Sequence, residues 1–129
     1  MDRSDIKIKL KDLSVMFVDD EEFVVEAMKE ILPMLFKDSY FALNGLEGLE
    51  QAKKSHIDIL ITDLSMPKMN GLDMIKNIKE FNPEIKVICV SGHNEGEFLQ
   101  KAKELKTSFI IKPISSNELF KALGEVLQL

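Results

Sequence analysis

The chain has little of what stabilises small secreted proteins or anchors membrane proteins. Its 129 residues include one cysteine, Cys89, and no tryptophan. A single cysteine excludes an internal disulfide bond, and its place in the apolar run VICV predicts a buried, unreactive thiol. Mainly apolar runs such as Ile57–Thr62 are far shorter than the roughly 20 residues of a membrane span, and residues 1–10 do not resemble a signal peptide. We expect a cytoplasmic protein without membrane contact.

The chain also lacks the charge of a nucleic-acid-binding protein. Its 22 acidic and 17 basic residues give a net charge of −5, and no basic stripe is visible. Binding to phosphate backbones needs such a stripe, so direct nucleic-acid binding is not expected. With 45% hydrophobic and 30% charged residues, the composition is that of an average soluble domain, and the length suits one domain with a proper core.

Short apolar runs alternate with longer segments of helical periodicity, which is typical of βα units. Five strands are predicted, at Leu13–Val18, Ser39–Leu43, Ile57–Thr62, Ile85–Val90 and Ser108–Ile111. Five helices are predicted, at Glu21–Leu35, Leu46–Lys54, Leu72–Phe81, Glu95–Lys106 and Ser116–Leu127. The pattern predicts an α/β fold with helices on both faces of a parallel sheet. Residues 13–129 form the predicted domain, and residues 1–12 are predicted to be an N-terminal extension or linker.

Polar residues follow four of the predicted strands at the point where each strand ends. They are Asp19 and Asp20 after the first strand, Asp63 after the third, Ser91 after the fourth and Lys112 after the fifth. Because ligands of such sheets bind at the carboxyl ends of the strands, we expect these side chains to form one site. Three carboxylates in a small volume repel one another unless a cation lies among them. Oxygen ligands without histidine or cysteine favour a hard ion, Mg²⁺ or Mn²⁺.

The same residues suit phosphoryl transfer to a carboxylate. An aspartate can attack phosphorus to form an aspartyl phosphate, which needs positioning and charge neutralisation more than an acid or a base. Asp63 stands alone at the end of a central strand and is the predicted nucleophile, with the acidic pair holding metal beside it. Lys112 would supply a positive charge for the phosphoryl oxygens, and Ser91 a hydrogen-bond donor.

Four segments, in order, resemble the receiver domains of bacterial two-component response regulators, the chemotaxis regulators among them. These segments are FVDDEE, DILITDLSMPKMNGLDMI, VICVSGH and IIKPI, and the resemblance extends from about Leu13 to Leu127. It implies a flavodoxin-like, doubly wound (βα)5 fold with five parallel strands in the order 2-1-3-4-5. It also implies a phosphoacceptor switch that is not an enzyme, apart from removing the phosphoryl group from itself.

The resemblance implies a role for each residue that matches the family's motifs. For metal and phosphate these are Asp63 as the phosphoacceptor, Asp19, Asp20 and Asp63 as metal ligands, the main-chain carbonyl of Ser65 as a further ligand, and Lys112 as the phosphate-pairing lysine. For switching they are the hydroxyl of Ser91, the inward-swinging side chain of Phe109, and Pro113 after a cis peptide bond. Gly48 departs from the family's usual alanine and should weaken its helix by about 1 kcal/mol.

The resemblance also implies partners. A histidine kinase or phosphotransfer protein would donate the phosphoryl group, and a downstream effector protein or domain would respond to it. The face formed by the fourth predicted helix, the fifth strand and the fifth helix would carry the signal. A homodimer formed on phosphorylation is a further expectation.

Several alternatives stay open. The chain could be a receiver domain cut from a hybrid histidine kinase or a multidomain regulator. A Mg²⁺-dependent phosphatase of the haloacid dehalogenase type also forms an aspartyl phosphate, but it needs an aspartate two residues after the nucleophile, where this chain has Ser65. A pseudo-receiver would bind partners without phosphoryl chemistry. The acidic pair, taken alone, could simply begin a helix, because Asp19 and Glu22 fit a capping box.

Overall fold

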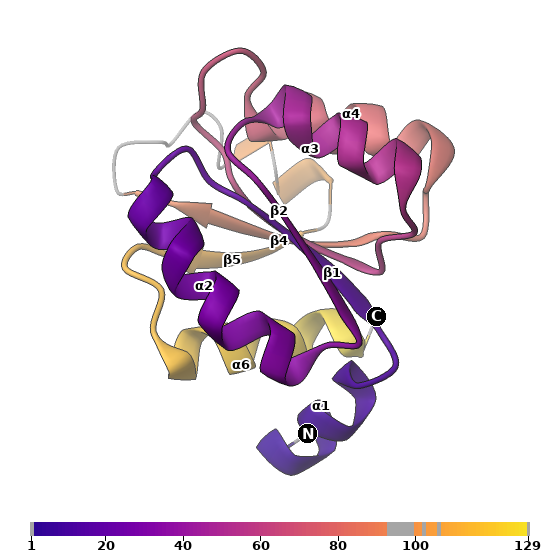
Figure 1. Ribbon diagram of the computed structural model, residues 1–129, viewed down its shortest axis with the longest axis vertical. Coiled ribbons are helices and arrows are strands. Elements are labelled where there is room, and N and C mark those ends of the chain that lie inside the picture. The colour runs from indigo at the N-terminus through magenta and orange to yellow at the C-terminus, as the bar shows by residue number, and fades with distance from the viewer. Residues whose placement is uncertain (1, 93–99, 102, 106, 129) are drawn as a thin grey trace.

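The computed structural model describes residues 2–92, 100–101, 103–105 and 107–128, and its centre is a five-stranded sheet (Figure 1). The strands are β1 (Ser14–Val18), β2 (Asp38–Ala42), β3 (Ile59–Asp63), β4 (Lys86–Ser91) and β5 (Ser108–Ile111). They lie in the order β2-β1-β3-β4-β5, and every neighbouring pair is parallel. The predicted flavodoxin-like fold is therefore confirmed, with each strand within two residues of its predicted bounds.

Four helices match the periodic segments of the sequence, and one does not. The helices are α1 (Arg3–Leu10), α2 (Glu22–Leu35), α3 (Gly45–Lys54), α4 (Gly71–Phe81) and α6 (Ser116–Leu127). All but α1 begin and end within one residue of their predicted bounds. The predicted helix Glu95–Lys106 lies largely outside the described residues. Among the residues that are described, no helix is both long and apolar enough to span a bilayer.

The helices form a layer on each face of the sheet (Figure 1). On β1, Val15 and Phe17 pack into the core shared with α2 and α6, whereas Met16 and Val18 pack into the core shared with α3 and α4. All five residues of β1 are buried, which explains why this strand is apolar without alternation. The site at its end is thus held by a strand that is fixed from both sides.

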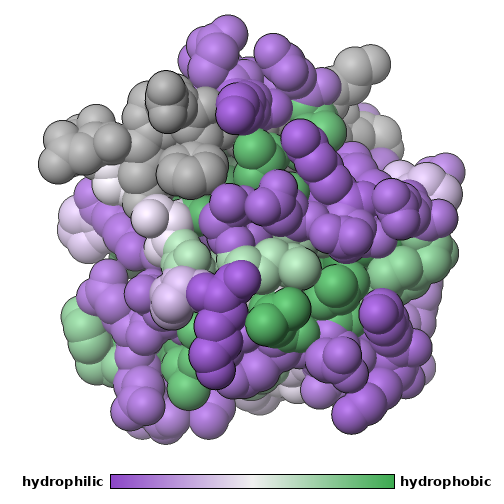
Figure 2. Space-filling model, turned by 90° about the horizontal axis from the view of Figure 1, so that it is seen from above, coloured by the Kyte–Doolittle hydropathy of each residue, from purple (hydrophilic) through white to green (hydrophobic). Residues whose placement is uncertain are grey.

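Gly48 lets α3 lie close to its neighbours. A Cβ atom at this position would lie 2.5 Å from Sδ of Met74 in α4 and 3.2 Å from a methyl group of Val18 in β1. A larger residue at this position would therefore require the side chains of Met74 and Val18 to shift. Seen from above, this side of the molecule is mostly hydrophilic, with hydrophobic residues in patches between the hydrophilic ones (Figure 2).

Residues 1–12, predicted as an extension or linker, contain the unexpected helix α1. Ile6 and Leu10 in this helix are 3% and 0% exposed and join the core formed with α2 and α6. The guanidinium group of Arg3 lies over the ring of Phe120 in α6, 4.6 Å from its centroid. Residues Arg3–Leu10 of the extension are therefore helical and pack against α6.

Candidate metal and phosphoryl site

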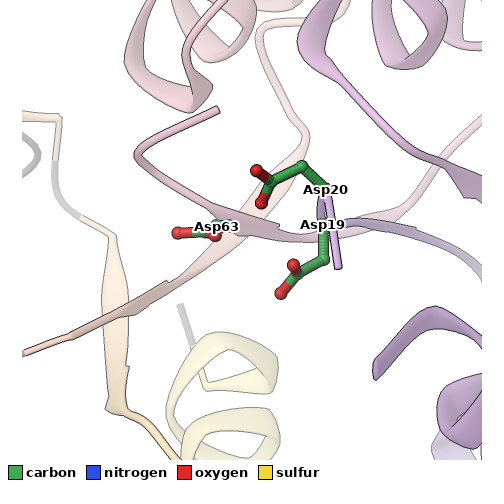
Figure 3. Close-up of side chains that lie close together, drawn as sticks. All are labelled: Asp19, Asp20 and Asp63. Atoms are coloured by element: carbon green, nitrogen blue, oxygen red, sulfur yellow. The ribbon is translucent and has the colours of Figure 1, made fainter. Parts of the chain in front are cut away.

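Three carboxylates meet at the carboxyl edge of β1 and β3. Asp19 and Asp20 directly follow β1, and Asp63 is the last residue of β3. The two strands are neighbours, with Val18 opposite Thr62, so the residues that follow lie side by side. One oxygen of each carboxylate lies within 4.8 Å of the others, and Figure 3 shows the three side chains close together at the strand ends. The structure thus brings together the three carboxylates that the sequence predicts as metal ligands.

Two of these carboxylates are buried. Asp19 is 0% and Asp63 2% exposed, whereas Asp20 is exposed. Burial raises the pKa of Asp19 and of Asp63, and the negative charge of a neighbouring aspartate raises each further. Oδ1 of Asp19 accepts a hydrogen bond from the N–H group of Glu21 at 2.9 Å, but its Oδ2 has no hydrogen-bond partner among the described residues. Of the two buried residues, Asp19 is therefore the one left with an oxygen that accepts no hydrogen bond.

Lys112, one residue past β5, brings a positive charge to the same place. Its Nζ lies 3.0 Å from Oδ2 of Asp63, 3.4 Å from Oε1 of Glu21 and 3.6 Å from Oδ2 of Asp19. Partial burial tends to lower the pKa of Lys112, but the hydrogen bond to Asp63 and the surrounding negative charges outweigh it and raise that pKa. Lys112 is therefore positively charged at neutral pH.

Ser91 and Pro113 lie beside this lysine. Ser91 ends β4, and its carbonyl accepts a hydrogen bond from the N–H group of Lys112 at 2.9 Å. The side chain is buried, and within the described part of the chain its Oγ has no hydrogen-bond partner. The peptide bond between Lys112 and Pro113 is cis, as the resemblance implied. An unpartnered hydroxyl at this rim is available to a ligand.

The loop after β3 brings Ser65 next to Asp63. The N–H group of Ser65 lies 3.3 Å from Oδ1 of Asp63, and the N–H group of Gly71 donates to the carbonyl of Leu64 at 2.8 Å. A Cβ atom at Gly71 would collide with the carbonyl oxygen of Asp63, so glycine is needed for α4 to begin this close to the strand end. Phe109 lies apart from this loop, within β5, where it packs against the core on the α3 and α4 side.

Glu21 contacts Lys112, which the sequence did not predict. It was interpreted, with Glu22, as a helix-start or solvent-facing acid, and it is indeed the N-cap residue of α2. The capping box proposed for Asp19 and Glu22 is absent, because Asp19 bonds to the N–H group of Glu21 instead. The side chain of Glu21 makes no capping bond and contacts Lys112. Nothing in the sequence distinguishes Glu21 from Glu22, since the contact depends on the direction in which α2 leaves the strand.

The donor set fits a hard divalent cation. Three carboxylates converge without histidine or cysteine, and Asp19 keeps a buried oxygen that lacks a hydrogen-bond partner. Oxygen-only ligands of this kind are typical of Mg²⁺ and Mn²⁺ sites. The ammonium group of Lys112 near the same carboxylates suits an anionic ligand such as a phosphoryl group. Such a ligand would contact the positive charges of the metal ion and of the lysine at the same time.

Comparisons with known proteins agree with this site. The family model described as the response regulator receiver domain matches residues 15–124. The chemotaxis protein CheY of Thermotoga maritima is 32% identical over 114 residues, which cover 87% of this chain and 95% of that protein.

Two further proteins resemble the chain, one a much longer sensor kinase/phosphatase and one a protein solved in a complex. The autoinducer 1 sensor kinase/phosphatase LuxN of Vibrio campbellii is 31% identical over 95% of this chain, but the chain spans 14% of the length of LuxN. A structure of the CheX-CheY-BeF₃-Mg²⁺ complex from Borrelia burgdorferi matches with 28% identity and a TM-score of 0.78, covering 91% of this chain and 90% of that one. The likeness thus extends to a protein of similar length and to part of a much longer one.

Proposed function

The chain belongs to the response regulator receiver domain family, whose members are phosphoacceptor switches rather than catalysts in the usual sense, and we propose that Asp63 is its phosphoacceptor. The observation that carries this proposal is the position of Asp63, a buried carboxylate 3.0 Å from the ammonium group of Lys112 and beside the acidic pair. Phosphorylation by a histidine kinase or phosphotransfer protein would then change the affinity for an effector. The only enzymatic step we assign to the chain is loss of its own phosphoryl group.

Mg²⁺ is the proposed cofactor, and Mn²⁺ would suit the same oxygen donors. Asp19, Asp20, Asp63 and the main-chain carbonyl of Ser65 would hold the ion, which neutralises the charge of the phosphoryl oxygens when bound. The likeness to a CheY solved with Mg²⁺ and a fluoride of beryllium supports this choice. The buried Oδ2 of Asp19, which accepts no hydrogen bond within the described residues and lies 3.6 Å from Nζ of Lys112, supports it independently.

The transfer step uses side chains that are already in place. A carboxylate oxygen of Asp63 would form a bond to phosphorus while the phosphorus–nitrogen bond of a donor phosphohistidine breaks and the histidine nitrogen keeps the electron pair. The ammonium group of Lys112, now 3.0 Å from Asp63, would follow the charge onto the phosphoryl oxygens. The free hydroxyl of Ser91 would turn toward them, and Phe109 would move inward. The signal would leave through residues 95–106, β5 and α6.

A direct experiment is phosphorylation by acetyl phosphate with Mg²⁺, followed by intact-mass spectrometry. Wild type should gain one phosphoryl group, and Asp63→Asn should gain none. Asp38→Asn is the matched control, because Asp38 is exposed at the start of β2 and the substitution removes the same charge. No incorporation into wild type, or equal incorporation into Asp63→Asn, would contradict the proposal.

A protein donor has an apolar surface to bind beside the site. A groove of about 450 Å³ is lined by Phe23, Ala27 and Ile114 together with the site residues Glu21 and Lys112. Phe23 is 72% exposed, so its ring is accessible to a partner. We propose that helices of the phosphohistidine donor pack here, since Lys112 is itself one of the residues that line the groove.

The variant Phe23→Ala should distinguish phosphorylation by a protein donor from phosphorylation by a small-molecule donor. Phosphorylation by acetyl phosphate should stay within about twofold of wild type, whereas transfer from a phosphorylated histidine kinase should slow by about tenfold, the effect of losing one buried aromatic contact of about 1.4 kcal/mol. Met34→Ala is the control, because Met34 is also exposed (81%) but does not line the groove. Equal transfer rates for the two variants would rule out this docking surface.

The match to LuxN, of which the chain spans 14%, supports the alternative that this receiver is part of a hybrid kinase, whereas the match to CheY over 95% of its length supports a stand-alone regulator. Sequencing the gene on both sides of the coding region for these 129 residues would decide it. A homodimer formed on phosphorylation stays a prediction, which sedimentation with and without acetyl phosphate would test.

A further inference from the structure

Glu21 contacts Lys112 from the solvent side of the site. The side chains of Asp19 and Asp63 are 0% and 3% exposed, whereas that of Glu21 is 44% exposed and that of Lys112 is 26% exposed. The ammonium group therefore has buried carboxylates on its inner side and the carboxylate of Glu21 toward solvent. A group that reaches Lys112 through the groove lined by both residues passes Glu21.

The main chain holds Glu21 in this position. Its N–H group donates to Oδ1 of Asp19 at 2.9 Å, and its φ of −90° and ψ of 107° are those of an ordinary N-cap residue. Glutamate is not a favoured N-cap, and here its side chain makes no capping bond. Capping of α2 therefore does not explain the direction of this side chain. The contact of its carboxylate with Nζ of Lys112 at 3.4 Å explains it.

Glu21 also differs from the other two carboxylates in what it is free to do. In the proposed function, Asp63 receives the phosphoryl group and Asp19 binds metal, so both change partners during the reaction. Glu21 has neither task, so its contact with Lys112 is the interaction that an incoming phosphoryl group has to compete with. Glu21 and Lys112 also line the same groove beside the site, where a donor would approach.

We propose that Glu21 is a positioning residue that holds the ammonium group of Lys112 at the mouth of the site and selects against highly anionic phosphodonors. This inference rests on the proposed function. The carboxylate of Glu21 competes with phosphoryl oxygens for Lys112 and repels a dianion that approaches from solvent. A donor with less negative charge, or one whose charge is delivered within a protein interface, is affected less.

The test compares two small donors with Glu21→Gln. Acetyl phosphate is a dianion at neutral pH, and phosphoramidate carries less negative charge. Glu21→Gln should raise the second-order rate constant with acetyl phosphate by about threefold and that with phosphoramidate by less than about 1.5-fold, and the difference should shrink in high salt. Glu22→Gln is the matched control, since Glu22 loses the same charge one residue away and forms none of the ion pairs of Lys112 in the described chain. It should change both rates by less than about 1.5-fold.

A second measurement needs no phosphodonor. The side-chain Cε and Nζ resonances of Lys112 should shift in Glu21→Gln and stay unchanged in Glu22→Gln, with Glu21→Ala as a further variant if the amide forms a new hydrogen bond. Equal responses of Glu21→Gln and Glu22→Gln, or a slower reaction of Glu21→Gln with acetyl phosphate, would overturn the inference. No phosphorylation of wild type would instead overturn the proposed function, and the resonances would still report the contact.

Discussion

The carboxylates at the two ends of the sheet have pKa values shifted in opposite directions. At the carboxyl end, burial raises the pKa of Asp19 and Asp63. At the amino end, just before β3, Asp58 is also partly buried, yet its pKa is lowered. Burial there tends to raise the pKa, but the N–H group of Ser14 at 2.8 Å from Oδ2 and the ring of His56 at 2.9 Å from Oδ1 outweigh it.

The difference lies in how deeply each carboxylate is buried and in which charges lie beside it, since Asp63 also has a donor at each oxygen. Both oxygens of Asp58 have partners, so this residue ties β3 to the start of β1 and needs nothing further. Asp19 keeps one buried oxygen without a hydrogen bond and lies beside a second buried carboxylate. The amino end of the sheet is therefore arranged for stability, whereas the carboxyl end keeps buried carboxylates with raised pKa values at the place where we propose that a cation and a phosphoryl group bind.

The largest expected change in stability comes from α1, which precedes the amino end of β1. Leu10→Ala removes a side chain that is 0% exposed and should lower the free energy of unfolding by about 3 kcal/mol. Ile8→Ala is the control, because Ile8 in the same helix is 67% exposed, and should cost less than about 0.5 kcal/mol. Urea unfolding measures both. Equal effects would mean that α1 does not pack on the domain in solution.

Asp58→Asn should have a smaller effect that depends on pH. We expect a loss of about 1.5 kcal/mol at pH 7, because hydrogen bonds to a charged acceptor are weakened. A carboxylate whose folded pKa is lowered stabilises the fold above its unfolded pKa of about 3.9 and loses this contribution as the pH falls through the folded value. The difference between variant and wild type should therefore shrink below about pH 4. Unfolding curves that differ equally at pH 7 and pH 3 would argue against the hydrogen-bonded carboxylate.

Asp20→Asn should have the smallest effect without metal, and in the opposite direction. Removing one of three crowded carboxylates should leave the metal-free protein as stable as wild type, or more stable by up to about 1 kcal/mol, because Asp20 is exposed and contributes to the raised pKa of Asp63. The same variant should lose its stabilisation by Mg²⁺, which for wild type amounts to about 2.7 kcal/mol at 100 times the dissociation constant. Thermal melts with Mg²⁺ and with a chelator would measure both. A strongly destabilised metal-free variant would contradict the idea of crowded carboxylates.

Most of the site could be predicted because a parallel sheet places the ends of its strands at one edge. Asp19, Asp63 and Lys112 each follow an apolar run, so the strand bounds alone bring them together. Helix α1 could not be predicted in the same way, since Ile6 and Leu10 give only one helical repeat among charged residues. The contact of Glu21 with Lys112 joins residues 91 positions apart and depends on a side-chain direction that no periodicity encodes.

The sequence by itself determined the α/β fold, the strand order that its family resemblance implies, and the residues of the rim, because hydrophobic periodicity sets the strands and helices and their ends set the edge. Tertiary structure alone decided which carboxylates are buried, that Asp58 is satisfied while Asp19 is not, and that Glu21 rather than Glu22 contacts Lys112. The physical reason is that hydrogen bonding and desolvation depend on the few ångströms between side chains from distant segments. Those distances are set only when the helices have packed on the sheet.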